Sequence, residues 1–175
     1  MGRMQVAAIA LLGVWLGWTV SMWFAATRTF RTVDRVLNSP NPQLTAATQP
    51  LGHDETRVVL RHLASEINRT FFGAYGVAQI PLGIALLFLI WRQTPRDTFA
   101  VVLAGVMLAL VLILTGAVTP QIIALGRSID FLPRNPEPAV MPRFWMLHGA
   151  FTGLDGVKLL AGLVLLARWI IGARP

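Results

Sequence analysis

The chain has no cysteine, a single lysine and only eight acidic residues in 175 positions. Without cysteine it can form no disulfide, no thiolate metal site and no cysteine nucleophile. Charged residues make up 13% of the chain and hydrophobic residues 55%, a balance far from that of soluble domains. The net charge of +7 comes from arginines that flank apolar runs, where they meet lipid phosphates. The composition therefore predicts a membrane protein that contacts lipids and binds no nucleic acid.

Four apolar runs recur along the chain, each close to the roughly 20 residues that cross about 30 Å of hydrocarbon as a helix. They cover residues 5–26, 71–91, 98–118 and 144–171. The first run is longer than the ~7 to 15 residue core of a secretory signal and no small-x-small cleavage site follows it, so we expect it to remain as an anchor. The sequence thus predicts an all-α integral membrane four-helix bundle. Residues 1–175 form one four-span domain with both termini on the same side.

The first two helices are expected to extend beyond the bilayer. The segment "TRTFRTVDRVLN" continues the first run without glycine or proline and places Phe30, Val33 and Leu37 at helical spacing, so the helix should reach Leu37. Three prolines then predict a loop over residues 38–53. Asp54 can cap the next helix, in which "DETRVVLRHLASEINRT" carries an apolar stripe. That stripe consists of Val59, Leu63 and Ile67.

Charges and prolines give expectations for the remaining loops. Within the tall hairpin of the first two helices, the arginines at positions 28, 31 and 35 can face Glu55 and Glu66. Pro120 should end the third span, because proline disfavours helical geometry at the residue before it. Nine arginines lie in the two longer loops and their helical extensions, against five on the side of the termini. By the positive-inside rule the long loops are cytoplasmic.

The fourth run, "FWMLHGAFTGLDGVKLLAGLVLLARWII", contains His148, Asp155 and Lys158. His148 and Asp155 are seven residues apart, so they differ by only about 20° around a helix, and Thr152 lies between them. Placing a charged side chain near the bilayer centre costs ~2.5 to 3.5 kcal/mol. Such a residue therefore usually has a compensating partner or a functional role. Asp155 and Lys158 can compensate each other three residues apart. Two interpretations stay open: a compensated structural pair, or a polar cavity for a proton or ligand.

The second run carries a matching polar face. Asn68, Tyr75 and Gln79 fall on one side of the helix, and Pro81 can bend it there. The candidate intramembrane polar site therefore comprises His148, Thr152, Asp155, Lys158, Asn68, Tyr75 and Gln79. Small residues at close-packing spacing predict helix contacts at Gly13, Gly17, Gly149, Gly153 and Gly156.

No catalytic set, phosphate loop or dinucleotide fingerprint is present. The three histidines are scattered and fit no zinc pattern, and only His148 is embedded, which argues against bis-histidine haem. We predict no metal site and no catalytic residues, and the sequence identifies no cofactor.

Two segments carry a family resemblance. "FWMLHGAFTGLDGVKLLAGLVLL", preceded by "VTPQIIALGRS", resembles the closing portion of the bacterial family called domain of unknown function 4149, relatives of eukaryotic transmembrane protein 205. The first run, "LLGVWLGWTVSMWFAATRTFR", is similar to that family's first span with its Trp-x-Gly core. The matching residues of the fourth run are Phe144, Leu147, His148, Gly149 and Leu154. Asp155 stands where the family often has asparagine, which adds a charge. The resemblance implies a four-helix membrane protein and no established chemistry.

Two functions are compatible with these features. The favoured hypothesis is a non-enzymatic scaffold or accessory subunit of a bacterial inner membrane that packs against lipids, other membrane proteins or copies of itself. The alternative is a small transporter or membrane oxidoreductase in which Asp155 and His148 handle protons while Tyr75 and Gln79 contact a ligand.

Overall fold

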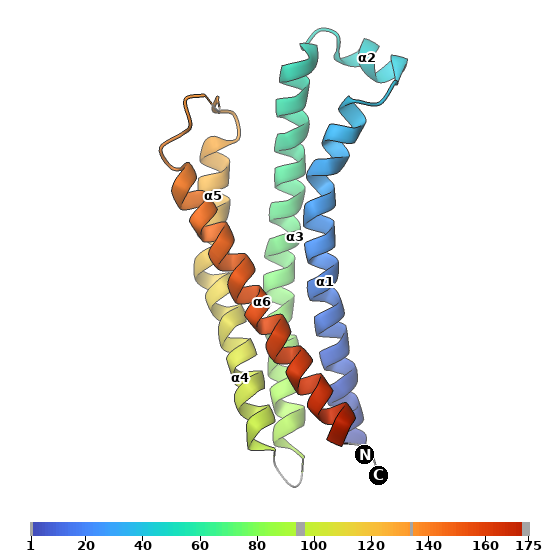
Figure 1. The fold of residues 1–175 in the computed structure, drawn as a ribbon, viewed down its shortest axis with the longest axis vertical. Coiled ribbons are helices and arrows are strands. Elements are labelled where there is room, and N and C mark those ends of the chain that lie inside the picture. The colour runs from blue at the N-terminus through green and yellow to red at the C-terminus, as the bar shows by residue number, and fades with distance from the viewer. Residues whose placement is uncertain (1, 94–96, 134, 173–175) are drawn as a thin grey trace.

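The computed structural model describes residues 2–93, 97–133 and 135–172, and within these ranges the chain is all-α without a strand. Its helices are α1 (Arg3–Leu37), α2 (Pro42–Thr48), α3 (Gly52–Trp91), α4 (Thr98–Ile113), a π-helical turn η1 (Leu114–Val118), α5 (Thr119–Ile129) and α6 (Met141–Gly172). Figure 1 shows the long helices side by side, with the start of α1 and the end of α6 at the same end of the molecule.

Three helical segments of the described chain are long and apolar enough to cross a membrane. They are Arg3–Leu37, Gly52–Trp91 and the continuous helix Thr98–Ile129. The prediction that the first helix reaches Leu37 is confirmed. With 35 and 40 residues, α1 and α3 are far longer than the roughly 20 residues that a bilayer needs. Together they form a tall hairpin that rises above the other helices in Figure 1.

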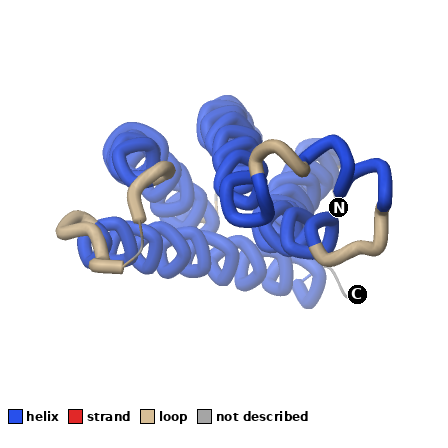
Figure 2. Tube along the Cα trace, turned by 90° about the horizontal axis from the view of Figure 1, so that it is seen from above, coloured by secondary structure: helices blue, strands red, loops and turns tan. Residues whose placement is uncertain are grey.

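The long helices pack in a ring. α1 contacts α3, α3 contacts α4, α4 contacts α6, and α6 returns to α1, so α3 and α6 lie on a diagonal. Figure 2, seen from above, shows α6 crossing along one side of the other helices. An apolar core fills the half nearest the termini, where Leu12, Leu86 and Leu165 have no exposed surface. Any polar group that joins α3 to α6 must therefore cross the centre of this ring.

Two loop predictions need correction. The segment 38–53 is not a loop throughout, because α2 forms within it and the side chain of Asn41 caps its first turn. α3 begins at Gly52, which has a φ of 74°, so Asp54 and Glu55 lie inside its first turn. There their negative charges interact favourably with the helix dipole.

The helix that was predicted to end at Pro120 continues beyond it. The helix continues through the π-helical turn η1 into α5, with Pro120 in the first turn of α5. The missing N–H of a proline does no harm at the first position of a helix, and the wider π turn directly before it interrupts the regular α-helical hydrogen bonds. The predicted end at residue 118 is therefore wrong.

The upper hairpin is packed differently from the expected pattern. The predicted stripe of Val59, Leu63 and Ile67 faces outward, with 50%, 55% and 41% of each residue exposed. α3 instead turns Thr56 and Ala64 inward, where both are buried. Both of these inward-facing residues have small side chains. The sequence prediction followed the spacing of the larger apolar residues, which are exposed.

Candidate functional site

A closed polar cluster lies between α1, α3 and α6, about midway along the helices. α6 contributes Asp155 and Lys158, which have no exposed surface, and α3 contributes Tyr75 and Gln79, each 2% exposed. α1 contributes the side chains of Trp15, Thr19 and Trp23. The structure thus brings together four of the seven predicted site residues.

Lys158 uses its full hydrogen-bonding capacity. Its Nζ donates to Tyr75 Oη at 2.8 Å, to Gln79 Oε1 and to Asp155 Oδ1. A protonated amine has three N–H donors and a neutral amine only two. Three acceptors around one nitrogen match the three N–H donors of the charged ammonium form.

Asp155 is surrounded by donors. Trp23 donates from Nε1 to Oδ2 at 2.7 Å, and Tyr75 donates from its hydroxyl to Oδ1 at 3.2 Å. Lys158 completes the shell at Oδ1. Because a protonated carboxyl would need an acceptor of its own, this environment fits the carboxylate. The pair is therefore a buried ion pair in which both charges are hydrogen-bonded.

Gln79 and Tyr75 connect the ion pair to α1. Gln79 Oε1 accepts from Trp15 Nε1 at 2.7 Å as well as from Lys158, while its Nε2 donates to the carbonyl of Tyr75 at 3.3 Å. The Tyr75 hydroxyl also lies 3.0 Å from Thr19 Oγ1. Each of these polar atoms has a partner, and in the described part of the chain the only buried side-chain atoms without one are Gln93 Nε2 and Thr115 Oγ1.

Helical spacing explains how each helix presents its part of the cluster. Trp15, Thr19 and Trp23 recur every four residues, so they share one face of α1. The sequence predictions did not include Trp15, Thr19 and Trp23, and their regular spacing on one face of α1 was the signal that could have found them. Close packing beside the cluster depends on Gly162, where an added Cβ would lie 2.5 Å from Leu16 Cδ2.

Three predicted residues lie outside the cluster. His148 is half-buried against the rings of Phe144 and Trp145, with its Nδ1 3.3 Å from the carbonyl oxygen of Phe144. Thr152 is exposed and donates to the carbonyl of His148 at 2.9 Å. Asn68 is half-buried, and no hydrogen bond joins it to the cluster among the described residues. His148 and Asp155 point in similar directions from α6 but do not share one site. Because α6 crosses the other helices obliquely, residues two turns apart on the same face meet different neighbours.

The predicted packing glycines also lie elsewhere. Gly13, Gly17, Gly149 and Gly153 are exposed, and an added Cβ at any of them would meet nothing within 4 Å. The prediction that these four pack helices together within the chain is wrong. Gly156 makes only ordinary contact, with an added Cβ 3.8 Å from Trp23. The close approaches occur instead at Gly76, Gly83, Gly126 and Gly162, where a neighbouring side-chain atom would lie within 3.0 Å.

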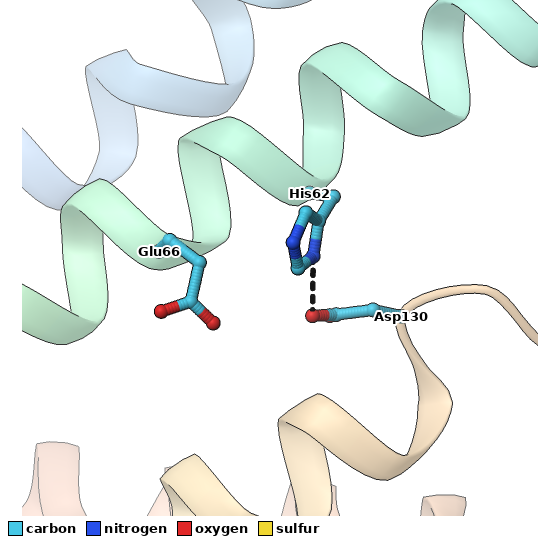
Figure 3. A group of neighbouring side chains, drawn as sticks. All are labelled: His62, Glu66 and Asp130. Atoms are coloured by element: carbon cyan, nitrogen blue, oxygen red, sulfur yellow. Dashed lines mark hydrogen bonds and ion pairs between the residues drawn. The ribbon is translucent and has the colours of Figure 1, made fainter.

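A second charged group, absent from the sequence predictions, joins α3 to the end of α5. His62, Glu66 and Asp130 bring possible metal-ligating atoms within 4.8 Å of one another. Figure 3 shows the three side chains pointing toward one another, with His62 Nδ1 2.8 Å from Asp130 Oδ2. A histidine with two carboxylates is a plausible ligand set for a divalent cation.

Arginines already occupy this position. Arg69 donates to both oxygens of Asp130 at 2.7 and 2.8 Å and to Glu66 at 2.5 Å. Arg127 donates to both oxygens of Glu66 at 3.1 and 3.0 Å. A metal ion would have to displace these guanidinium groups. The arrangement is better described as an ionic clasp between α3 and α5, formed by His62, Glu66, Arg69, Arg127 and Asp130.

The clasp shifts the acidity of its carboxyl groups. Hydrogen bonds from Arg127 and then Arg69 lower the pKa of Glu66 to about 2. Burial opposes a similar shift at Asp130, but the hydrogen bonds from Arg69 and His62 outweigh it and lower the pKa of that carboxyl. Both acids are therefore ionised at neutral pH.

Two surface cavities lie away from the polar cluster. One of about 470 Å³ lies at the end of the termini and is lined by Gln5, Asp97, Arg168, Trp169, Ile171 and Gly172. Another of about 310 Å³ lies on α3 beside Glu66 and Phe71. Neither is lined by a residue of the cluster, and the side chains of Asp155 and Lys158 have no exposed surface.

The chain was also compared with known proteins. No family model, no curated protein and no solved structure matches it. Membership of the family suggested by the first and fourth apolar runs therefore stays a prediction that rests on those residues alone.

Proposed function

We propose that the protein is a four-span integral membrane protein, with α6 as the fourth span. α6 has 32 residues and packs against both α1 and α4. Its only charged residues between Arg143 and Arg168 are the paired Asp155 and Lys158, which point into the ring. Its outer face is apolar, with Leu160 and Val164 more than half exposed. A lipid environment accounts for both faces.

Within the membrane the protein acts as a non-enzymatic scaffold or accessory subunit that packs against lipids or other membrane proteins. The observation that carries this proposal is the closed polar cluster. Its ion pair is saturated with hydrogen bonds from three helices, and no cavity described above opens onto it. A transporter or oxidoreductase needs a path by which protons or ligand reach such groups. The alternative function therefore has less support than a structural role.

A structural role gives the ion pair a physical purpose. A buried ion pair contributes little net stability compared with apolar residues of the same shape, but a wrongly paired helix would leave a charge buried alone. The arrangement of α1, α3 and α6 described above satisfies Lys158 and Asp155 together. We infer that the cluster fixes how these helices assemble.

The cellular setting follows from the sequence. The excess of arginine around the two longer loops supports a cytoplasmic position for the tall hairpin. The resemblance to the bacterial family supports an inner membrane location. Alkaline carbonate extraction of expressing cells tests integration directly, and release of the chain into the supernatant would overturn it.

The experiment that separates scaffold from transporter uses the variant Asp155→Asn/Lys158→Met. The purified native chain and this variant are reconstituted into liposomes loaded with a pH-sensitive dye, and a potassium gradient with valinomycin supplies the driving force. We expect both to match protein-free liposomes. A proton flux that the native chain supports and the variant loses would overturn the scaffold proposal.

A further inference from the structure

Three arginines on the upper part of α1 have no ionic partner. Arg28, Arg31 and Arg35 are all exposed, and none forms an ion pair with any residue in the described ranges. Their spacing of three and four residues places them on one face of the helix, within ~10.5 Å along its axis. The expected pairing of these arginines with Glu55 and Glu66 is therefore wrong.

Nearby acids are already neutralised by other arginines. Asp34 lies 3.5 Å from both Arg57 and Arg61, which reach it from α3. Glu66 belongs to the ionic clasp, where two arginines bind it. Among the described residues, the positive charge on this face of α1 therefore has no carboxylate partner, which leaves it available to an anion from outside.

Below the arginines the same face of α1 is apolar and open. Phe24 and Val20 are 59% and 55% exposed, and Gly17 and Gly13 follow at the next turns with free space around them. The Arg28 guanidinium lies 4.8 Å from the centre of the Phe24 ring, where the apolar surface meets the charged one. An apolar strip directly beneath a row of cations matches the two parts of a lipid molecule.

We propose that this face of α1, formed by Gly13, Gly17, Val20, Phe24, Arg28, Arg31 and Arg35, binds an anionic phospholipid. The headgroup phosphate binds Arg28 and Arg31, with Arg35 adding positive field above them. One acyl chain lies along Phe24 and Val20 and fills the space left by the two glycines. This inference depends on the proposed membrane integration, and it specifies the class of lipid that the proposed scaffold binds.

A second copy of the chain is a poorer occupant. Two-fold pairing through this face would bring three arginines of each copy against those of the other, and like charges at an interface are repulsive. The glycines could favour such a helix pair by themselves, but the arginine row above them opposes it. An acidic helix of another protein would neutralise the arginines. It would not account for the apolar strip that lies directly beneath them, which a lipid acyl chain would cover.

The absence of cysteine allows a direct test with one introduced label. The variant Val20→Cys carries bimane on the proposed face, and the variant Ile84→Cys carries it on the outer face of α3, where Ile84 is 55% exposed. Each is reconstituted into phosphatidylcholine vesicles containing equal small fractions of dibrominated phosphatidylglycerol or dibrominated phosphatidylcholine. Bromine quenches the label only in direct contact, so the ratio of the two signals reports local enrichment of the anionic lipid.

We expect phosphatidylglycerol to quench the label at position 20 more strongly than phosphatidylcholine, and both to quench equally at position 84. Adding Arg28→Gln/Arg31→Gln should lower the enrichment by roughly fivefold or more, because each arginine near the surface contributes about a fivefold preference for anionic lipid. The matched control Arg3→Gln/Arg92→Gln removes the same charge from exposed positions at the opposite end of the molecule and should leave the enrichment intact.

The other outcomes overturn the proposal in distinguishable ways. Equal quenching at position 20 by both lipids would show that the face has no anionic preference. Quenching at position 84 with none at position 20 would show that a second copy of the chain covers this face. A loss of enrichment in the control pair would assign the effect to net charge. Absence of quenching at both positions would instead contradict membrane integration itself.

Discussion

The buried ion pair makes a sharp prediction about stability. Replacing Lys158 by methionine keeps much of the side-chain volume but removes the charge that balances Asp155. The carboxylate would retain Trp23 and Tyr75 as donors and lose its counter-ion in a site without solvent. Removing one partner of a buried pair costs about 3 to 5 kcal/mol, because the remaining charge is uncompensated.

The double variant Asp155→Asn/Lys158→Met should recover most of that loss. Asparagine keeps an oxygen to accept from Trp23, and no net charge remains in the cluster. Replacing a whole buried pair is often neutral or stabilising. We therefore expect the double variant to lie within about 1 to 2 kcal/mol of the native chain, which corresponds to a coupling energy of a few kcal/mol.

Unfolding in dodecyl maltoside by titration with sodium dodecyl sulfate measures these differences. Circular dichroism is the better readout, because Trp15 and Trp23 belong to the cluster and their fluorescence would respond locally. If Lys158→Met unfolds at the same detergent fraction as the native chain, Asp155 has found another compensation and the proposed role of the pair is wrong. Equal destabilisation of the single and double variants would also contradict it.

Two further predictions concern packing and pH. Gly162→Ala should destabilise the chain by about 1 to 3 kcal/mol in the same titration, since the added Cβ would lie 2.5 Å from Leu16 and 3.1 Å from Met107. Gly153→Ala serves as the control with open space, and equal effects at both positions would contradict the packing described here. The ionic clasp should loosen in acid: the pKa of Glu66 is lowered from 4.5 to about 2, so its stabilisation is present above pH 4.5 and is lost as pH falls toward 2. Spin labels on Leu63→Cys/Ser128→Cys should report a constant distance between pH 8 and 5 and a longer one only as the pH approaches 2; loosening already at pH 6 would contradict this assignment.

The helical architecture could be read largely from the sequence because lipid imposes simple rules. The apolar run, its continuation without glycine or proline and the helical spacing of the residues that follow predicted the end of α1 at Leu37. The boundary at Pro120 could not be read in this way. Whether a proline ends a helix depends on the turn before it, and the π-helical turn at residues 114–118 has no signature in composition.

The candidate site was predictable only in part. Charges inside an apolar run must be paired, which correctly drew attention to Asp155 and Lys158, and the phase of α3 supplied Tyr75 and Gln79. The angular position around a helix could not show which residues at other heights join them, and the structure places His148, Thr152 and Asn68 outside the cluster. The contribution of Trp15 was hidden because tryptophan in a membrane helix is usually read as an interfacial or packing residue.

The π-helical turn also governs residues far from it. A π turn holds one more residue than an α-helical turn, so α5 continues with the angular phase of a helix one residue shorter. That offset of about 100° decides which residues of α5 look toward α3. Arg127 and Asp130 therefore owe their places in the clasp to an extra residue more than two turns earlier in the same helix. An insertion or deletion at residues 114–118 would therefore rotate α5 about its axis relative to α3, while α4 kept its orientation.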